Sequence, residues 1–210
     1  GLLRPDAGEI HLLGERIDGL RPDAISARGL ARTFQGSRVF PEMTVLDNVK
    51  VGFHRRFPYD LVSALGHLPR FRECERRIET EARDLLESFG LGPHARKPAG
   101  SLPYGLQRMV ELVRALASSP RLLLLDEPAA GLSPGETEAL LESLLRARSE
   151  RGLTVLLIEH DMRLVMNLCN PVHVLHHGEI IAWGEPSAVR AHPQVVEAYL
   201  GRRRNGGARR

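Results

Sequence analysis

The spacing of apolar residues along the chain changes several times, and each change marks a different kind of element. Short apolar runs next to glycines at 9–13 and 30–34 predict strands. Between residues 41 and 114 apolar side chains recur every three or four positions, which indicates helices. Two further apolar runs, at 122–125 and 154–159, are again of strand length. Strands that alternate with helices predict an α/β core with a mostly parallel sheet and a helix-rich insert.

Several helix boundaries carry local signals. Thr44 is a suitable N-cap for a helix over 45–53, and the segment 133–136 has the serine, proline and glutamate of a capping box. An amphipathic helix is expected over 70–89 and another after Gly105. The apolar faces of these two helices consist of Ile78, Ala82, Leu85, Leu86 and Phe89, and of Met109, Val110, Leu112, Val113, Leu116 and Ala117.

The run 122–125 is the most apolar stretch of the sequence. A continuous run of this length suits a central strand of a parallel sheet that is buried on both faces, and we expect the same of 154–159. Closer to the C-terminus, the segments 173–177 and 179–183 predict a hairpin about Gly178.

Composition narrows the class of protein. The 210 residues, 42% of them hydrophobic, are enough for one domain-sized core. No apolar run approaches the roughly 18 residues of a membrane-spanning helix. The two cysteines, Cys74 and Cys169, are too few and too far apart for a disulfide framework or a zinc site. Much of the net charge of +3 comes from arginines within 202–210, which we interpret as a solvated end rather than a nucleic-acid or lipid contact.

Asp126 and Glu127 are the first candidates for chemistry, because both carboxylates directly follow the apolar run. In nucleotide hydrolases an acid at the end of such a strand holds the Mg²⁺ that bridges the β- and γ-phosphates. A second carboxylate beside it can act as a general base towards the attacking water. On its own, the pair is equally consistent with an acidic turn after a core strand.

His160 is the second candidate, because it lies just beyond the next apolar run. The ends of neighbouring parallel strands lie at one edge of a sheet, where such folds bind ligands. A histidine there could sense a γ-phosphate by hydrogen bonding. A lone histidine is more often structural, so this interpretation depends on the other candidates.

The segment 101–108 is the third candidate, since it places Gly105 at the start of a helix. Free amides and the positive end of the helix dipole form a ready anion site there. An ordinary turn that contains glycine is the alternative.

In their order and spacing these segments resemble the motifs of ABC-transporter ATPases. The Q-loop, signature loop, Walker B with catalytic glutamate, D-loop and switch histidine are matched by Gln35, 102–108, Asp126-Glu127, 129–133 and His160. The resemblance covers essentially the whole chain. It implies a P-loop NTPase core with a mostly parallel sheet plus a helical subdomain.

The resemblance also implies roles for these residues. Two such subunits pair head to tail around two ATP molecules, so that each site combines Asp126 of one chain with the signature loop of the other. The signature-loop residues that would bind nucleotide are Leu102, Pro103, Tyr104, Gly105 and Gln107. Asp126 and Gln35 would bind nucleotide and Mg²⁺, Glu127 would be the general base, and His160 would contact the γ-phosphate.

Within the family, the likeness is to ATPase subunits of branched-chain amino acid importers. The segments that carry it are 31–35, 40–49, 101–105, 126–132, 158–166 and 196–201. It implies a peripheral subunit on the cytoplasmic face of the bacterial inner membrane, a second identical or different ATPase subunit, and integral permease subunits. A periplasmic or extracellular substrate-binding protein would be an indirect partner, and no nucleic acid is expected. Importers of urea or amides and a lipopolysaccharide exporter have similar ATPases, so the cargo stays open.

The same resemblance implies four segments along the chain. We expect a partial ATPase core over 1–40 and a helical subdomain over 41–115 that ends in the signature motif and its helix. The rest of the core, with Walker B, D-loop and switch histidine, is expected over 116–185. A C-terminal extension with a basic tail is expected over 186–210.

The chain departs from the family pattern at three places. None of the 210 residues forms the Gly-x-x-x-x-Gly-Lys-Ser/Thr loop that cradles phosphates, because Lys50 and Lys97 are the only lysines and neither is in a glycine-rich segment. We interpret this as an N-terminal truncation and expect these residues alone to be inactive. Leu106 replaces the usual Gln or Glu of the signature loop, and Ser133 the usual Asn or Asp of the D-loop.

Two other functions remain compatible with the sequence. A soluble ABC ATPase of translation or DNA repair would usually have two cassettes or long coiled-coil insertions, and neither is present in this sequence. A non-catalytic ABC-like binding or regulatory module is favoured by the missing P-loop lysine. The intact Glu127 and His160 argue against it.

Overall fold

The structure is a computed structural model that describes residues 1, 3–33, 39–54, 56–57 and 69–200, except the side chains of 199 and 200. It divides into two compact units, Gly1–Ile158 and Glu159–Arg210, and each is described by itself. This division does not test the four segments that the sequence analysis expects, so they stay predictions.

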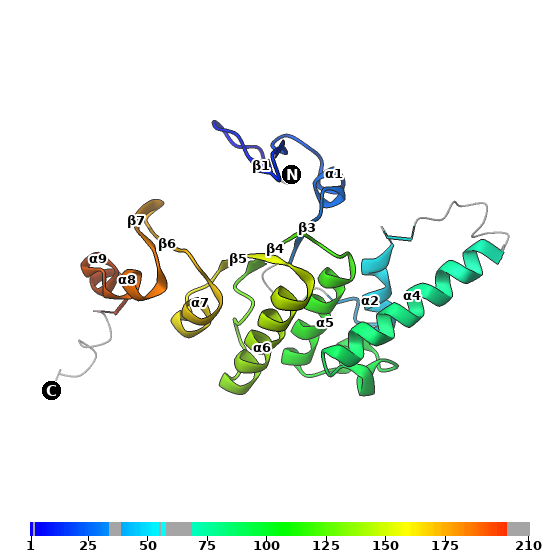
Figure 1. Cartoon of the computed structure of the whole chain (residues 1–210). Coiled ribbons are helices and arrows are strands. Elements are labelled where there is room, and N and C mark those ends of the chain that lie inside the picture. The colour runs from blue at the N-terminus through cyan, green and yellow to red at the C-terminus, as the bar shows by residue number, and fades with distance from the viewer. Residues whose placement is uncertain (2, 34–38, 55, 58–68, 201–210) are drawn as a thin grey trace. The chain divides into compact units, whose positions relative to one another are not determined.

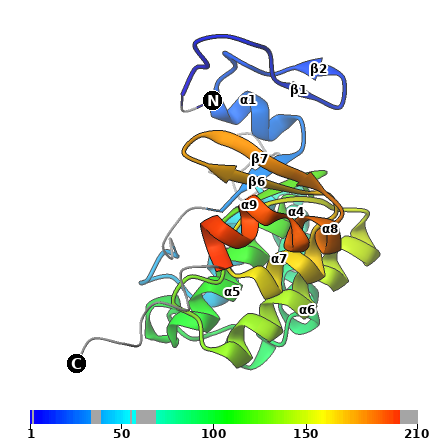
Figure 2. The same cartoon turned by 90° about the vertical axis from the view of Figure 1, so that its left-hand side faces the viewer.

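The first unit begins with a short antiparallel ribbon of β1 (His11–Leu12) and β2 (Glu15–Arg16), followed by α1 (Pro22–Ala27). Figure 2 shows the ribbon beside α1. A small apolar core joins them, made of Leu12, Ile17 and Ile25 with Leu20, Leu30 and Leu122 packed against it. The guanidinium of Arg16 and the amide of Ile10 both donate to Asp18, and these hydrogen bonds lower the pKa of Asp18 to about 2.

The predicted parallel sheet is confirmed. It consists of β3 (Leu30–Arg32), β4 (Leu122–Asp126) and β5 (Thr154–Ile158), in the order β3-β4-β5, with both pairings parallel. In the register, Arg32 lies opposite Leu124 and Asp126 lies opposite Ile158. The apolar run 122–125 is therefore the central strand, as its pattern predicts.

The expectation that these strands are buried on both faces is wrong. Figure 1 shows α5 and α6 on one side of the sheet, and alternate β4 residues, Leu123 and Leu125, are buried. On the opposite face Leu124 is only half-buried, and Leu156 and Ile158 of β5 are 52% and 58% exposed. An apolar run shows only that each of its positions can be buried. It does not show which face of the sheet the described residues cover.

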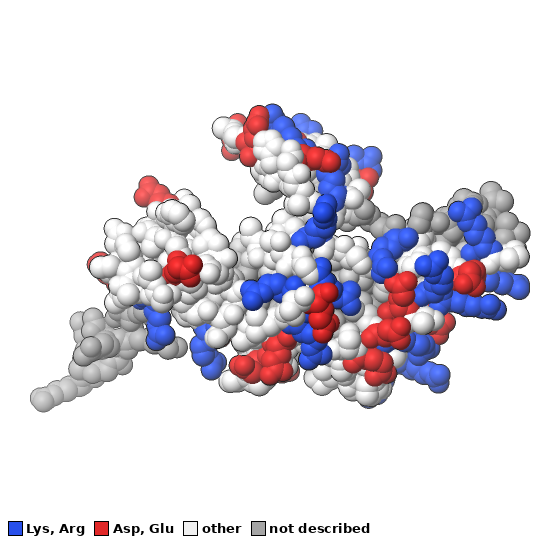
Figure 3. Space-filling view, viewed as in Figure 1, with Lys and Arg blue, Asp and Glu red and all other residues white. Residues whose placement is uncertain are grey.

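The helix-rich insert is confirmed. Its described helices are α2 (Val45–Phe53), α4 (Pro69–Ser88) and α5 (Tyr104–Ala117), with one-turn 3₁₀ segments η1 (Gly92–His94) and η2 (Ala99–Ser101). Side chains with no exposed surface form its core: Val45, Val49, Ala82, Leu86, Val110, Val113 and Leu116. The outer surface of α4 mixes acidic and basic side chains (Figure 3).

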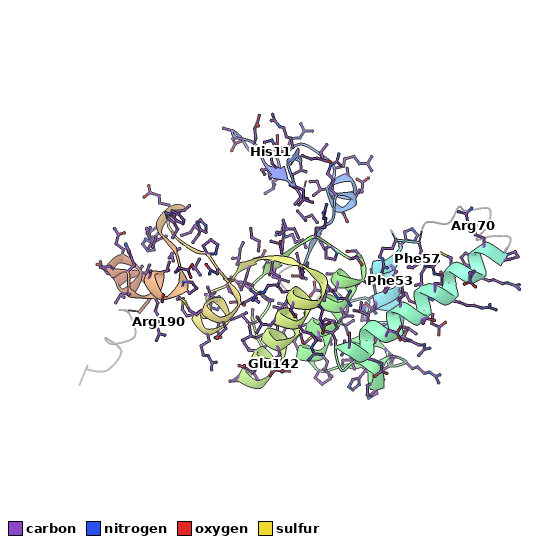
Figure 4. All side chains as sticks on the ribbon, in the orientation of Figure 1. His11, Phe53, Phe57, Arg70, Glu142 and Arg190 are labelled. Atoms are coloured by element: carbon purple, nitrogen blue, oxygen red, sulfur yellow. The ribbon has the colours of Figure 1, made fainter. Side chains whose placement is uncertain are left out.

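Two local features fix the position of α2. The hydroxyl of Thr44 accepts a hydrogen bond from the amide of Asp47 at 3.0 Å, which confirms the predicted N-cap. Gly52 lies against α5 so closely that a β-carbon there would overlap the carbonyl oxygen of Arg114. At the end of α2 the rings of Phe53 and Phe57 lie together, with centroids 6.3 Å apart (Figure 4).

The last helix of the first unit, α6 (Pro134–Arg151), begins with the predicted capping box and ends at Gly152 in a left-handed conformation. The second unit contains α7 (Met162–Leu168), β6 (Val172–His176), β7 (Glu179–Gly184), α8 (Pro186–Ala191), α9 (Pro193–Val195) and the π-helical turn η3 (Val196–Leu200). The strands β6 and β7 pair antiparallel, which confirms the predicted hairpin. Val172, Val189 and Val195 form the core of this unit.

Among the described residues, no helix combines the length and the hydropathy that crossing a bilayer requires. Cys74 and Cys169 are half-buried, and neither is part of a disulfide. The arginine-rich segment 202–210 lies outside the described residues.

Candidate functional site

Asp126 is the last residue of β4, at the carboxyl edge of the sheet. Its side chain is 28% exposed, and Arg32 Nη2 donates a hydrogen bond to Asp126 Oδ2 at 3.1 Å. The register explains this contact, because Arg32 lies opposite Leu124, two residues before Asp126 on the adjacent strand. A carboxylate in this place, with one oxygen bound and water accessible, is a suitable single ligand for a divalent cation.

Glu127 has an unusual backbone conformation for a residue with a side chain. Its φ is 45°, in the left-handed region that costs such residues about 1–3 kcal/mol. Two hydrogen bonds hold it there. Its amide donates to the carbonyl of Ile158 at 2.9 Å, and its own carbonyl accepts from the amide of Ala130 at 3.1 Å. The backbone of the second acidic residue is thus fixed at the strand end, directly after Asp126.

The loop before α5 is anchored from both sides. Leu102 is buried, and its carbonyl accepts a hydrogen bond from Nε2 of Gln107 at 2.8 Å. The amide of Gln107 donates to the carbonyl of Pro103 at 3.1 Å, which closes the first helical turn. Pro103 occupies the N-cap position, where proline offers no side-chain oxygen to the first amides of α5. The side-chain amide nitrogen of Gln107 is therefore already hydrogen-bonded within the loop.

The start of α5 lies against the segment 129–133 and the start of α6. A β-carbon on Gly105 would overlap the carboxylate of Glu136, and one on Gly131 would lie 3.2 Å from the ring of Tyr104. The guanidinium of Arg108 lies over the ring of Tyr104, 5.4 Å from the ring centroid. The structure thus brings together the segments that resemble the signature loop and the D-loop.

Ser133 and Glu136 complete the start of α6. The amide and hydroxyl of Ser133 donate to Glu136 Oε2 at 2.8 and 2.7 Å, and the amide of Glu136 donates to the Ser133 hydroxyl at 3.4 Å. The hydrogen bonds from Ser133 lower the pKa of Glu136 below its ordinary 4.5. Serine in place of the family's Asn or Asp is therefore an effective cap here.

The chain after the Q-loop segment is tied to α2 and α5. Asn48, which has no exposed surface, accepts from the amide of Phe40 at 2.8 Å and donates to the carbonyl of Phe40 at 3.0 Å. The guanidinium of Arg114 lies 5.2 Å from the centroid of the Phe40 ring, and burial lowers the pKa of Arg114. Gln35 itself, within 34–38, lies outside the described residues.

His160 belongs to the second unit and is carried by a capped turn. The side chain of Glu159 has no exposed surface, and its Oε2 accepts from the amides of His160 at 2.9 Å and Asp161 at 3.2 Å. Asp161 caps α7 by accepting from the amide of Arg163 at 2.8 Å. His160 is 71% exposed on this turn. Its position relative to Glu127 stays a prediction, because the units are described separately.

Sequence reasoning missed Arg32 and Glu159, and it predicted the cap formed by Glu136 but not the position of Glu136 beside Gly105. All three residues contact predicted site residues. The Glu159-His160-Asp161 sequence before a helix is a local signal that could have revealed the turn. Arg32 and Glu136 depend on contacts between distant segments, for which a single sequence carries no signal.

The described residues contain no group of three or more His, Cys, Asp or Glu side chains that could hold a metal ion. Mg²⁺ bound beside phosphates commonly has one or two protein carboxylates and completes its coordination with waters and phosphate oxygens. Asp126 is the carboxylate that the geometry offers for this purpose.

Comparison with known proteins identifies the family. The ABC transporter family matches residues 1–130 of the chain. The chain is 43% identical over 201 residues to the high-affinity branched-chain amino acid transport ATP-binding protein BraF of Pseudomonas aeruginosa. This alignment covers 96% of this chain and 79% of the relative. The chain belongs to the ABC transporter family.

Other ABC transporter proteins support this assignment. The chain is 41% identical to the transport ATP-binding protein LivG of Escherichia coli, with the same two coverages of 96% and 79%. A nucleotide-free ATP-binding cassette from an ABC transporter superposes with a TM-score of 0.77 at 31% identity, over 95% of this chain and 79% of that structure. An ADP-bound cassette superposes equally well, at 30% identity. Residues 179–204 also match a branched-chain amino acid ATP-binding cassette transporter family.

Proposed function

We propose that this chain is the ATP-binding and ATP-hydrolysing subunit of an importer that takes up branched-chain amino acids. The cargo assignment is supported by the match at 179–204 and by the names of the relatives at 43% and 41% identity. The observation that carries the catalytic part is the strand end itself. Asp126 ends the central strand, and Glu127 follows it in a left-handed backbone conformation held by β5.

The proposed chemistry assigns one task to each carboxylate. Asp126 binds the Mg²⁺ that neutralises charge on the β- and γ-phosphates of ATP. Glu127 accepts a proton from the attacking water as that water bonds to the γ-phosphorus and ADP leaves. His160 donates a hydrogen bond to a γ-phosphate oxygen, and the amide side chain of Gln35 approaches Mg²⁺ and the water.

The start of α5 serves the nucleotide of a second subunit. The amides of the first turn of α5 receive no hydrogen bond from the side chain of the N-cap residue Pro103, and we propose that the partner's γ-phosphate binds there. The second subunit is identical or closely related. With this chain at the cytoplasmic face of the membrane, integral permease subunits and an external substrate-binding protein complete the importer.

The phosphates need one further element. None of these 210 residues forms a Gly-x-x-x-x-Gly-Lys-Ser/Thr loop, and we propose that the 210 residues alone do not hydrolyse ATP. Residues that supply this loop would restore turnover, because its amides and lysine hold the phosphates against Asp126. The missing lysine also favours a non-catalytic binding module, which is the competing function.

The deciding experiment compares Mg²⁺-dependent ATP hydrolysis by the chain with that of an extended chain, in which a relative's strand and P-loop precede Gly1. We expect turnover only from the extended chain. Glu127→Gln should lower it about 10²–10⁴-fold, the usual contribution of a general base. Glu138→Gln, which removes the same charge from an exposed position on α6, should have no effect. An extended chain that binds ATP without turnover would favour the non-catalytic module.

A further inference from the structure

Arg32 has no role in the proposed reaction, yet it contacts the carboxylate that would bind the cation. It is the last residue of β3, and it reaches Asp126 across 94 positions of sequence. Arg32 and Leu124 are register partners, so Arg32 and Asp126 project from the same face of the sheet, one pleat apart. A long guanidinium side chain spans that offset, and the Nη2–Oδ2 distance is 3.1 Å.

The arrangement places the demands of two cations on one carboxylate. Asp126 Oδ2 accepts the hydrogen bond from Arg32, and the carboxylate is also the group that the strand end offers to Mg²⁺. An arginine stays charged at every physiological pH, so the carboxylate has a permanent counter-ion before any metal arrives. The guanidinium and a divalent cation therefore compete for Asp126.

The exposure of the pair makes exchange feasible. The side chains of Arg32 and Asp126 are 44% and 28% exposed, so water can replace the guanidinium as it leaves. Ion pairs with this exposure contribute little net stability. A buried pair would instead resist separation, because each charge would lose its partner in a low-dielectric environment.

We propose that Arg32 is a positioning residue that occupies the Asp126 carboxylate until a divalent cation replaces it, and so raises the cation concentration at which the site fills. The proposal rests on the proposed function, since it takes Asp126 as the metal ligand. Arg32 does not contact the reacting atoms. It acts through the orientation and availability of Asp126.

The test is a Mn²⁺ titration of the full 210-residue chain, followed by NMR through paramagnetic broadening of the Asp126 and Glu127 amide signals. Broadening reports weak binding and requires no turnover. In Arg32→Met the Mn²⁺ concentration for half-maximal broadening should be about twofold to fivefold lower, as expected for loss of a partly exposed ion pair. Arg32→Lys, which keeps the charge, should restore the parent value at least in part.

Two control variants separate this effect from general electrostatics. Arg28→Met removes the same charge from another ion pair of the first unit, Arg28–Glu15, and should leave the titration unchanged. Asp126→Asn should abolish the local broadening, with or without Arg32.

Each other outcome is decisive. A concentration in Arg32→Met that is unchanged or higher, while the broadening still depends on Asp126, overturns the Arg32 proposal and leaves the proposed function standing. No broadening in any variant overturns it too, because the carboxylate then takes no cation in this chain. Broadening that survives Asp126→Asn places the cation elsewhere and contradicts both proposals.

Discussion

Two helices of the first unit begin beside each other, and their first turns are completed in opposite ways. At the start of α6, Ser133 and Glu136 exchange hydrogen bonds in a full capping box. At the start of α5, Pro103 offers no acceptor and the first turn contains no acidic residue. Every helix begins with amides that lack intrahelical partners. In α6 the cap residue provides an acceptor for them, whereas in α5 the cap residue provides none, and we propose that an external phosphate does so.

The two helix starts are nevertheless coupled. The carboxylate of Glu136, which closes the cap of α6, lies where a side chain on Gly105 would have to be. The glycine in the first turn of α5 is therefore required by the cap of its neighbour, independently of any nucleotide. Gly105 is therefore needed for the fold, whereas the uncapped amides that begin α5 are the groups that we propose for binding.

The largest expected effect comes from giving α5 a cap of its own. Pro103→Asp would place a carboxylate at the N-cap position and should raise the free energy of unfolding by about 0.5–2 kcal/mol. The same carboxylate would repel a phosphate, so hydrolysis by the extended chain should fall at least about tenfold, since one charge-assisted contact to a phosphate is worth that much. Urea unfolding and an ATPase assay measure the two effects.

Pro103→Ala is the matched control, because alanine removes the ring without adding an anion. It should retain most of the activity. Equal activity of Pro103→Asp and Pro103→Ala would contradict the role of the α5 start as an anion site.

The next effect concerns the cap of α6. Ser133→Ala removes the hydroxyl that accepts from the amide of Glu136, and the free energy of unfolding should fall by about 1 kcal/mol. Ser133→Asp keeps a cap acceptor and should unfold at nearly the parent urea concentration. If Ser133→Ala costs nothing, the capping box contributes no stability and the contrast between the two helices is lost.

A smaller difference is expected between two glycines that lie in the first turns of these helices. Around Gly135 of α6 there is open space, so Gly135→Ala should stabilise the chain by about 0.5–1 kcal/mol through helix propensity. Gly105→Ala must displace Glu136 and so weaken the capping box of α6. The stability lost with that cap should equal or exceed the stability gained from helix propensity. Thermal unfolding of both variants gives the comparison, and equal stabilisation would show that Glu136 moves away without cost.

The smallest effect is in the pH dependence. The folded pKa of Glu136 lies below its unfolded value, so its contribution to stability is present above the unfolded pKa and is lost as the pH falls through the folded pKa. Urea unfolding from pH 6 to pH 3 should therefore show a shallower acid loss in Glu136→Gln than in the parent. Identical slopes would mean that the hydrogen bonds from Ser133 do not favour the ionised carboxyl group.

Local signals in the sequence predict much of this molecule. The caps at Thr44 and Ser133 and the hairpin about Gly178 depend on residues within a few positions of one another, and all three are confirmed. The parallel sheet follows from alternating strand and helix patterns. The Asp126-Glu127 pair is recognisable because it directly follows the most apolar run.

What the sequence does not predict depends on distant contacts. The exposure of Leu156 and Ile158 depends on which face of the sheet is covered, and their apolar character suggests the opposite. The contacts of Arg32 with Asp126 and of Glu136 with Gly105 join segments that are far apart in the sequence. Neither contact changes the local pattern of its segment.

The most direct test of the account is sedimentation of the extended chain carrying Glu127→Gln, with and without ATP and Mg²⁺. If Glu127 is the base and the start of α5 binds a partner's phosphate, blocked hydrolysis should trap a dimer that forms only with ATP, and adding Pro103→Asp should return it to monomer. A dimer that persists with Pro103→Asp, or a monomer at every ATP concentration at which the chain binds ATP, would contradict the account.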